Sequence, residues 1–228
     1  MYFGLLFLIS TTSTTFATEK DVQKILVWGD SLSAAYGIPV EKGWVSLLET
    51  KLGDGYEIIN GSISGETTQG GLSRLSTALT THIPDLIIIE LGANDGLRGF
   101  PPQVTKHNLR QMIEQSKQAN TKVMLMGMKI PPNYGVAYSD RFESLFKDLA
   151  TEYKLPFIPF FLKDVIEDLT FFQKDELHPT AEAQPIILET IFLTLQDALQ
   201  NNFKNTSGGT LQDSATDTKE PEAIKNPA

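Results

Sequence analysis

Five short apolar runs alternate with longer amphipathic segments along the middle of the chain. The runs at 86–91 and 123–126 are almost continuously apolar, which is typical of parallel strands covered by helices on both faces. The other runs end in glycine or begin at proline, which are signals that delimit strands. The predicted strands are 24–28, 56–60, 86–91, 123–126 and 156–158.

Helical periodicity fills the intervals between these runs. The predicted helices are 44–52, 72–79, 109–119, 142–150 and 181–199. Because strand and helix alternate, we expect right-handed crossovers and a parallel sheet between two helical layers. The predicted fold class is α/β: a three-layer α/β/α sandwich with a five-stranded parallel sheet, flavodoxin-like, whose functional residues gather at the carboxyl ends of the strands.

The two ends of the chain differ from its middle. Residues 1–17 contain no charged side chain, and their apolar run at 2–9 is too short to span a bilayer. We expect a signal peptide there, with an uncleaved anchor or a misassigned start as alternatives, since the usual basic residues are missing. Residues 205–228 are mostly polar and predict a disordered tail, which leaves one folded domain at 18–204.

Charge and composition narrow the choice of partners and chemistry. The formal net charge of −9 argues against nucleic acid or an anionic membrane surface as a partner. The chain has no cysteine, so it contains no disulfide, thiolate nucleophile or cysteine-ligated zinc. Covalent catalysis would therefore need an oxygen or nitrogen nucleophile.

Ser31 follows the first predicted strand. Gly29 permits a tight turn at the end of that strand and places Ser31 beyond the sheet edge. A serine in this position is also a common helix N-cap, so the turn alone does not decide its role. Ser33 replaces the second glycine of the G-x-S-x-G elbow, which argues against an α/β-hydrolase.

His178 is the candidate base among the three histidines of the chain. His82 lies at a probable helix end and His107 in a polar stretch, and both are expected at the surface. Asp175, three residues before His178, can hold one ring nitrogen and leave the other free to take a proton from Ser31. A helix-capping aspartate beside a solvated histidine is the alternative interpretation.

Two glycine-containing loops offer donors for a developing negative charge. Gly65 lies in the loop after the second strand, where a missing Cβ lets a backbone N–H approach a ligand. Asn94 follows the third strand, and its side-chain amide can donate to an oxyanion. Both sequences are also common in ordinary turns.

These residues together resemble the SGNH, or GDSL, hydrolase family. Its four blocks appear in order: G-D-S-L at 29–32, Gly65, G-x-N-D at 92–95 and D-x-x-H at 175–178. Further stretches at 90–100, 132–135, 159–161 and 183–185 are similar to the bacterial multifunctional enzymes of this family, which are thioesterases, lysophospholipases and arylesterases.

The resemblance implies roles for the singled-out residues. Ser31 would be the nucleophile, His178 the base and Asp175 the residue that orients it. The oxyanion hole would consist of the Ser31 N–H, the Gly65 N–H and the Asn94 side chain. No metal and no organic cofactor is implied, and the substrate would be a small-molecule acyl ester or thioester, with lysophospholipids among the candidates.

The acyl group needs an apolar slot, which the loops at the same sheet edge can supply. Each candidate can equally belong to the ordinary core. The candidates are Leu97, Phe100, Ile130, Pro131, Tyr134 and Phe161.

Other functions and the cellular setting remain open at this point. A carbohydrate O-acetyl esterase would use the same four blocks, and fold alone does not fix a substrate. A non-catalytic flavodoxin-like binding module is a further alternative, although the chain has no phosphate-binding glycine motif. We expect a monomer in the bacterial periplasm or outside the cell, with no stable membrane anchor after signal removal.

Overall fold

The computed structural model describes residues 22–206 and contains one five-stranded parallel sheet in this range. The strand order is β2-β1-β3-β4-β5, which confirms the predicted α/β class. The expected signal peptide at 1–17 and all but the start of the expected tail at 205–228 lie outside the described residues. The strands are β1 (Gln23–Gly29), β2 (Tyr56–Asn60), β3 (Leu86–Glu90), β4 (Lys122–Met126) and β5 (Phe157–Ile158).

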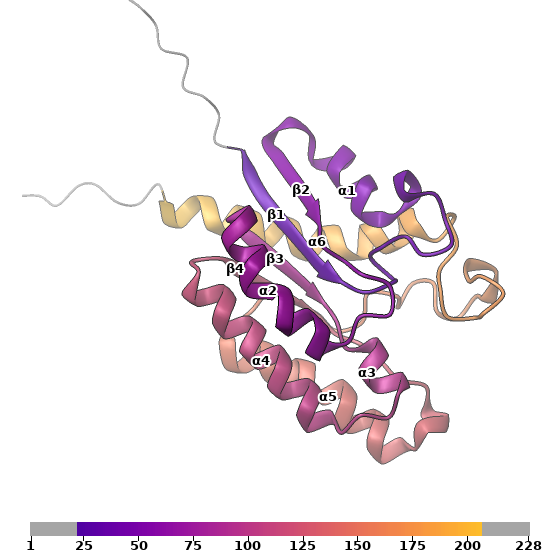
Figure 1. Cartoon of the computed structure of the whole chain (residues 1–228). Helices are drawn as coiled ribbons and strands as arrows, with labels where there is room; N and C mark the ends of the chain where they lie inside the picture. Colours follow the sequence, from indigo (N-terminus) through magenta and orange to yellow (C-terminus); the bar gives the residue numbers. More distant parts are fainter. Residues whose placement is uncertain (1–21, 207–228) are drawn as a thin grey trace, which may run out of the picture.

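Helices cover both faces of the sheet and produce the predicted three layers (Figure 1). On one face α1 (Trp44–Leu52) packs against α6 (Gln184–Thr206). On the other face α4 (Pro102–Gln118) packs between α2 (Thr68–His82) and α5 (Val136–Tyr153).

The burial of each strand matches its place in the sheet. All five residues of β3 are buried, because this strand has a neighbour on each side and helices above and below. The edge strand β2 keeps its residues half-buried or exposed, in agreement with its less continuous apolar run. The near-continuous apolar pattern therefore identified the central strands correctly.

Most helices extend beyond their apolar stripes. Helix α2 begins four positions before the predicted residue 72, because the Thr67 hydroxyl accepts the N–H of Gly70 (3.2 Å) and caps the helix. Helix α6 begins at Gln184 instead of 181, with Pro185 in its first turn, where proline is tolerated. The short helix α3 (Ala93–Leu97) is not predicted, because five residues are too few to show a helical period.

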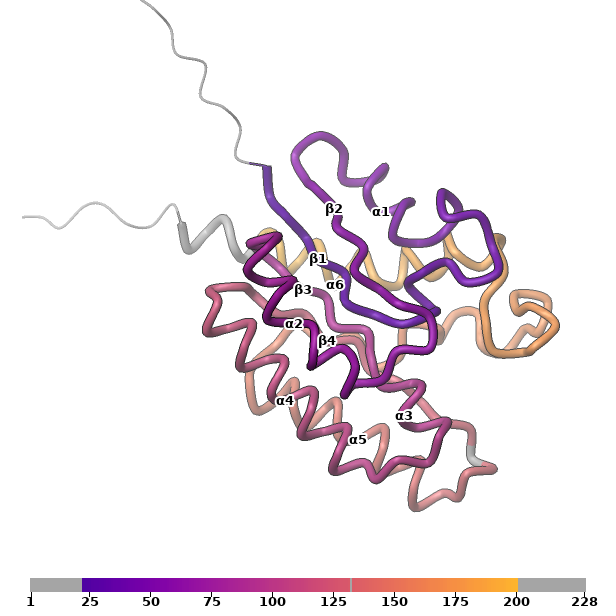
Figure 2. The backbone as a smooth tube through the Cα atoms, viewed as in Figure 1, coloured from indigo at the N-terminus to yellow at the C-terminus, as the bar shows by residue number. Residues whose placement is uncertain are grey.

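The chain order changes direction around β1, and this positions the site. From β1 the chain passes to β2 on one side, and then to β3 on the other side of β1. Ligands of open α/β sheets bind outside the strand ends at such a reversal. The segments after β1 and β3 and the segment before α6 lie at this end of the sheet (Figure 2).

Within residues 22–206 the structure contains no helix with the length and apolarity needed to cross a bilayer.

Candidate active site

Ser31 lies in a tight turn at the end of β1. Gly29 is required there, because a Cβ built on it would lie only 2.5 Å from the Glu90 carboxylate oxygen Oε2. The Asp30 side chain accepts the N–H of Leu32 (3.0 Å), and its carbonyl accepts the N–H of Ala34 (3.0 Å). These bonds close the turn and leave Ser31 half-buried beyond the sheet.

His178 contacts Ser31 on one side of its ring and Asp175 on the other. Its Nε2 lies 2.9 Å from Ser31 Oγ, and its Nδ1 lies 2.7 Å from Asp175 Oδ2. The imidazole can therefore relay a proton only through Nε2, since the carboxylate holds Nδ1–H. The side chain of His178 is 21% exposed, so it faces the solvent side of the turn without being fully solvated.

Asp175 both caps its own turn and orients the histidine. Its Oδ1 accepts the backbone N–H groups of Leu177 and His178, each at 3.0 Å, while Oδ2 contacts the ring. The His178 backbone N–H is the main cause that lowers the pKa of Asp175 to about 2, and the ring contact adds to it. Asp175 can therefore cap the local turn and orient His178 at the same time. Its carboxyl group is ionised at neutral pH.

The segment around His178 is tied to the turn after β1. The Gln173 side chain donates to the carbonyls of Tyr36 (2.8 Å) and Pro179 (3.1 Å), and the Gln173 N–H donates to the His178 carbonyl (2.8 Å). The Tyr36 ring lies over the His178 ring, with 4.4 Å between the centroids. These long-range contacts fix the imidazole beside Ser31.

Asn94 and Gly65 occupy neighbouring loops at the same end of the sheet. The Asn94 amide Nδ2 donates to Asp30 Oδ2 (3.0 Å), and Asn94 is half-buried at the start of α3. Gly65 is exposed and has φ +79°, which favours glycine, and its carbonyl accepts from Arg98 (3.0 Å). The loop of Gly65 is joined to β1 through the bond from Ile63 N–H to the Gly29 carbonyl (3.1 Å).

A hollow of about 220 Å³ opens beside Ser31, Asn94 and His178. Of the predicted acyl-binding residues, Leu97, Ile130 and Pro131 line it. The lining residues do not include Phe100, Tyr134 or Phe161; the first two are exposed and Phe161 is 1% exposed in the core. The apolar lining also includes Leu32, Ala93, Met128, Phe160, Leu162, Ile166, Phe172 and Leu177.

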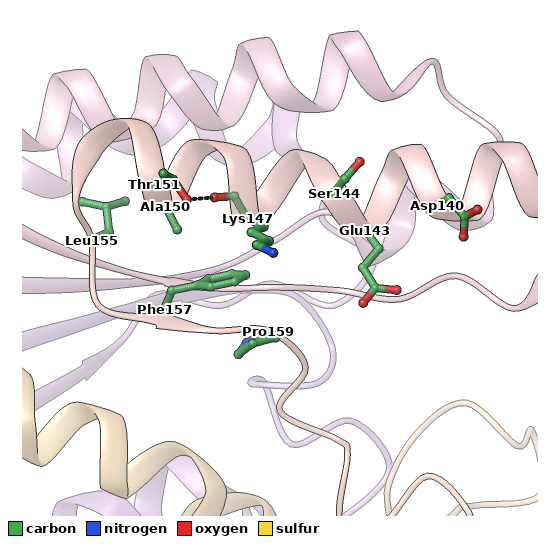
Figure 3. Close-up of a pocket in the computed structure, with 9 residues that line it drawn as sticks. All are labelled: Asp140, Glu143, Ser144, Lys147, Ala150, Thr151, Leu155, Phe157 and Pro159. Carbon is green, nitrogen blue, oxygen red and sulfur yellow. Dashed lines mark hydrogen bonds between the residues drawn. The ribbon is translucent and has the colours of Figure 1, made fainter.

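A second, larger hollow of about 730 Å³ lies between α5 and the segment at 155–159 (Figure 3). It shares no lining residue with the hollow beside Ser31 and contains no histidine. Its charged members Asp140, Glu143 and Lys147 come from the exposed side of α5. Size alone therefore does not identify the reactive site, whereas the serine, imidazole and carboxylate contacts do.

Two further residues packed beside this site escaped the sequence analysis. Glu90 is fully buried at the end of β3. An ionisable residue at the end of an otherwise apolar run could have indicated a buried polar contact there. Tyr36 offered no local signal, because its contact with His178 joins distant parts of the chain. Within the described range no group of three histidine, aspartate or glutamate side chains is arranged to hold a metal ion.

Comparisons with known proteins show the family of this chain. Residues 27–185 match the model of the GDSL-like lipase/acylhydrolase family. An arylesterase from Vibrio mimicus is 49% identical over 178 residues, which cover 77% of this chain and 89% of the relative. The thioesterase 1/protease 1/lysophospholipase L1 of Escherichia coli K12 is 39% identical over 197 residues, covering 86% of this chain and 93% of that protein.

A solved structure shows the same architecture. The psychrotrophic esterase EstA from Pseudoalteromonas sp., inhibited by monoethylphosphonate, has a TM-score of 0.75 and 42% identity. The match covers 78% of this chain and 99% of that structure. On these findings the chain is a hydrolase and belongs to the GDSL-like lipase/acylhydrolase family.

Proposed function

We propose that this hydrolase cleaves carboxylic esters and thioesters of fatty acyl groups through Ser31, His178 and Asp175. The observation that supports these roles is the line of contacts from Ser31 Oγ to His178 Nε2 (2.9 Å) and from His178 Nδ1 to Asp175 (2.7 Å). A serine hydroxyl is a weak nucleophile until a base takes its proton. This arrangement supplies the base and fixes its tautomer.

The reaction proceeds in two acyl transfers. Ser31 Oγ attacks the carbonyl carbon while its proton passes to His178 Nε2, and Asp175 stabilises the imidazolium that forms. The tetrahedral intermediate collapses, the imidazolium protonates the leaving alcohol or thiol, and the acyl group stays on Ser31. Water then repeats the attack with His178 as base, which releases the acid and restores the Ser31 hydroxyl.

The oxyanion is stabilised by donors from three segments. We assign this role to the Ser31 N–H, the Gly65 N–H and the Asn94 side-chain amide. Asn94 lines the same hollow as Ser31. Gly65 has a positive φ and no Cβ, so no side chain hinders the approach of a ligand to its backbone. Donors held in place before the reaction are typically the largest single contribution to catalysis.

The hollow favours a fatty acyl chain over an acetyl group. Most of its lining is apolar and includes Leu97, Ile130, Ile166 and Leu177. The relative named lysophospholipase supports the same substrate class, and lysophospholipids are natural candidates. We further propose that the enzyme is an exported monomer, for which the charge-free apolar segment at 1–17 is the support for export.

The test combines covalent labelling with turnover. A fluorophosphonate probe should label one serine stoichiometrically, because only an activated nucleophile reacts with it. Ser31→Ala should lose labelling and turnover, whereas Ser73→Ala, at an exposed position of α2, should keep both. Turnover of p-nitrophenyl octanoate should exceed that of the acetate. Labelling that persists in Ser31→Ala contradicts the assigned nucleophile, and a preference for acetate contradicts the fatty acyl substrate.

A further inference from the structure

Two carboxyl groups lie buried directly behind Ser31, and the proposed mechanism uses neither. Asp30 and Glu90 are both 0% exposed, at the ends of the adjacent strands β1 and β3. Glu90 Oε2 accepts the Asp30 N–H (3.3 Å) and contacts the Ser33 hydroxyl (2.5 Å). Its other oxygen, Oε1, is buried without a hydrogen-bond partner in the described part of the chain.

Burial raises the pKa of both carboxyl groups in this pair. Burial and the neighbouring Asp30 raise the pKa of Glu90 well above its ordinary value. Burial also raises the pKa of Asp30, but hydrogen bonds from the Leu32 N–H and the Asn94 amide oppose this and leave it at about 6. Asp30 is therefore a carboxylate above that pH.

An ionised carboxylate restricts the orientation of the Asn94 amide. Asp30 Oδ2 can only accept, so Asn94 must turn its NH₂ group and not its carbonyl toward it, as the 3.0 Å contact shows. The NH₂ group carries two hydrogens, and one remains after the bond to Asp30. Because Asn94 and Ser31 line the same hollow, the second hydrogen is available to a substrate oxygen there.

We propose that Asp30 is a positioning residue that fixes the side-chain amide of Asn94 with its free N–H facing the oxyanion. The proposal deepens the proposed function and depends on the role assigned to Asn94. Without a fixed acceptor the amide could turn by 180° and present its carbonyl oxygen to the developing negative charge. Such an orientation would repel the oxyanion that the donor should stabilise.

Asp30→Asn separates this role from the local turn. Asp30 Oδ1 accepts the Leu32 N–H (3.0 Å), and asparagine can keep that bond because it retains one oxygen. Its NH₂ group would then face Asn94. Since the Leu32 N–H is fixed by the backbone while the Asn94 amide can rotate, Asn94 is the partner that should change orientation.

A double-mutant cycle on p-nitrophenyl octanoate tests the proposal. Asn94→Ala should lower kcat by about 10²–10³-fold. Asp30→Asn should lower kcat at least ~10-fold with little change in KM, because only the transition state carries the full negative charge. The kcat of the double variant should be no lower than that of Asn94→Ala alone. If Asp30 acts only through Asn94, the effects of the two substitutions on kcat are not additive.

Glu90→Gln is the matched control, because it changes the other carboxyl of the same buried pair, whose Oε2 contacts the Asp30 N–H and the Ser33 hydroxyl instead of Asn94. Glu90→Gln should retain kcat within ~3-fold, because the Asn94 amide and the other oxyanion donors stay in place. An equal loss in Glu90→Gln and Asp30→Asn would overturn the proposal in favour of a general packing role. Thermal unfolding of each variant establishes that it is folded, and Asp30→Ser replaces Asp30→Asn in the cycle if the latter does not fold.

The outcomes distinguish this proposal from the proposed function. If Asn94→Ala keeps its kcat, the assigned oxyanion hole is wrong, and the role of Asp30 is wrong with it. Two results would overturn only the positioning role of Asp30, provided that Asn94→Ala has a lowered kcat. The first is an unchanged kcat in the Asp30 variant. The second is a double variant whose loss of kcat equals the product of the two single losses.

Discussion

His178 Nε2 lies 2.9 Å from Ser31 Oγ, although 147 residues separate the two in sequence. Ser31 is held by the turn after β1, and His178 by the segment that leads into α6. The Gln173 side chain connects these two parts through its bond to the Tyr36 carbonyl (2.8 Å). A hydroxyl and an imidazole from the two halves of the chain therefore meet in a geometry suited to proton transfer.

Activity should rise with pH because His178 must be neutral to accept the Ser31 proton. Histidine side chains in general change charge within about pH 5–8, and the assay spans this range. Asp175, with its pKa lowered to about 2, is already ionised there and adds no step to the pH profile.

Asp175→Asn should lower kcat by roughly 10⁴-fold, as in comparable triads, because the amide no longer fixes the tautomer of His178.

The measurement is kcat for p-nitrophenyl octanoate between pH 5 and 9. A flat profile in the unmodified enzyme would contradict the role of His178. A fully active Asp175→Asn would show that the backbone alone orients the ring.

Tyr36 should support catalysis through its ring and not through its hydroxyl. Its ring centroid lies 4.4 Å from that of His178, and 49% of the residue is exposed. An aromatic face near a cation stabilises it by about 0.5–1 kcal/mol at exposed sites, so it should favour the imidazolium of the transition state. Tyr36→Ala should therefore lower kcat by about 2–5-fold.

Tyr36→Phe is the matched control, because it retains the ring and should retain kcat. Steady-state kinetics of both variants check the expectation. An equal loss in the two would point to the hydroxyl instead of the ring.

Ile166 should affect long acyl chains more than short ones. It lines the hollow beside Ser31 and is 45% exposed, so Ile166→Ser removes apolar surface without emptying the core. Each buried CH₂ group is worth about 0.8 kcal/mol, and the loss of about two such contacts should raise KM for the octanoate ester by roughly 15-fold. KM for the acetate ester should change little.

Leu193→Ser serves as the control, since Leu193 is 68% exposed on α6 and does not line the hollow. Kinetics with acetate, butyrate and octanoate esters measure the effect. Equal changes for all chain lengths in Ile166→Ser would place the acyl chain elsewhere.

Folding stability should fall as pH rises above the range where unfolded carboxyl groups titrate. The folded pKa of Asp30 is raised to about 6 and that of Glu90 is raised well above its ordinary value, both chiefly by burial. Between about pH 4 and these values the folded state binds more protons than the unfolded state, so stability decreases with pH. The raised pKa of Asp30 corresponds to a decrease of about 3 kcal/mol.

Glu90→Gln should reduce this slope, because glutamine does not titrate and leaves only Asp30 to contribute. Urea unfolding at pH 4.5, 6 and 8 measures the slope in both proteins. A steeper decrease in Glu90→Gln than in the unmodified protein would contradict the assigned burial penalty.

Local patterns were sufficient to predict the strands, their parallel arrangement and the short-range part of the site. The continuous apolar runs identified β3 and β4, because a strand buried on both faces leaves no room for polar residues. The contact between Asp175 and His178 spans only three positions and depends on one turn. Helix α3 was missed because its five residues contain no measurable period.

Tertiary structure alone decided which side chains surround the reacting atoms. Phe160 lines the hollow and its neighbour Phe161 enters the core, because adjacent side chains of an irregular segment point in different directions that packing selects. The bond from Asn94 to Asp30 spans 64 residues and exists only because β1 and β3 are neighbours in the sheet. Periodicity and turn chemistry act over a few residues, so the sequence determined which elements form, whereas the meeting of their loops depended on how the sheet and helices pack.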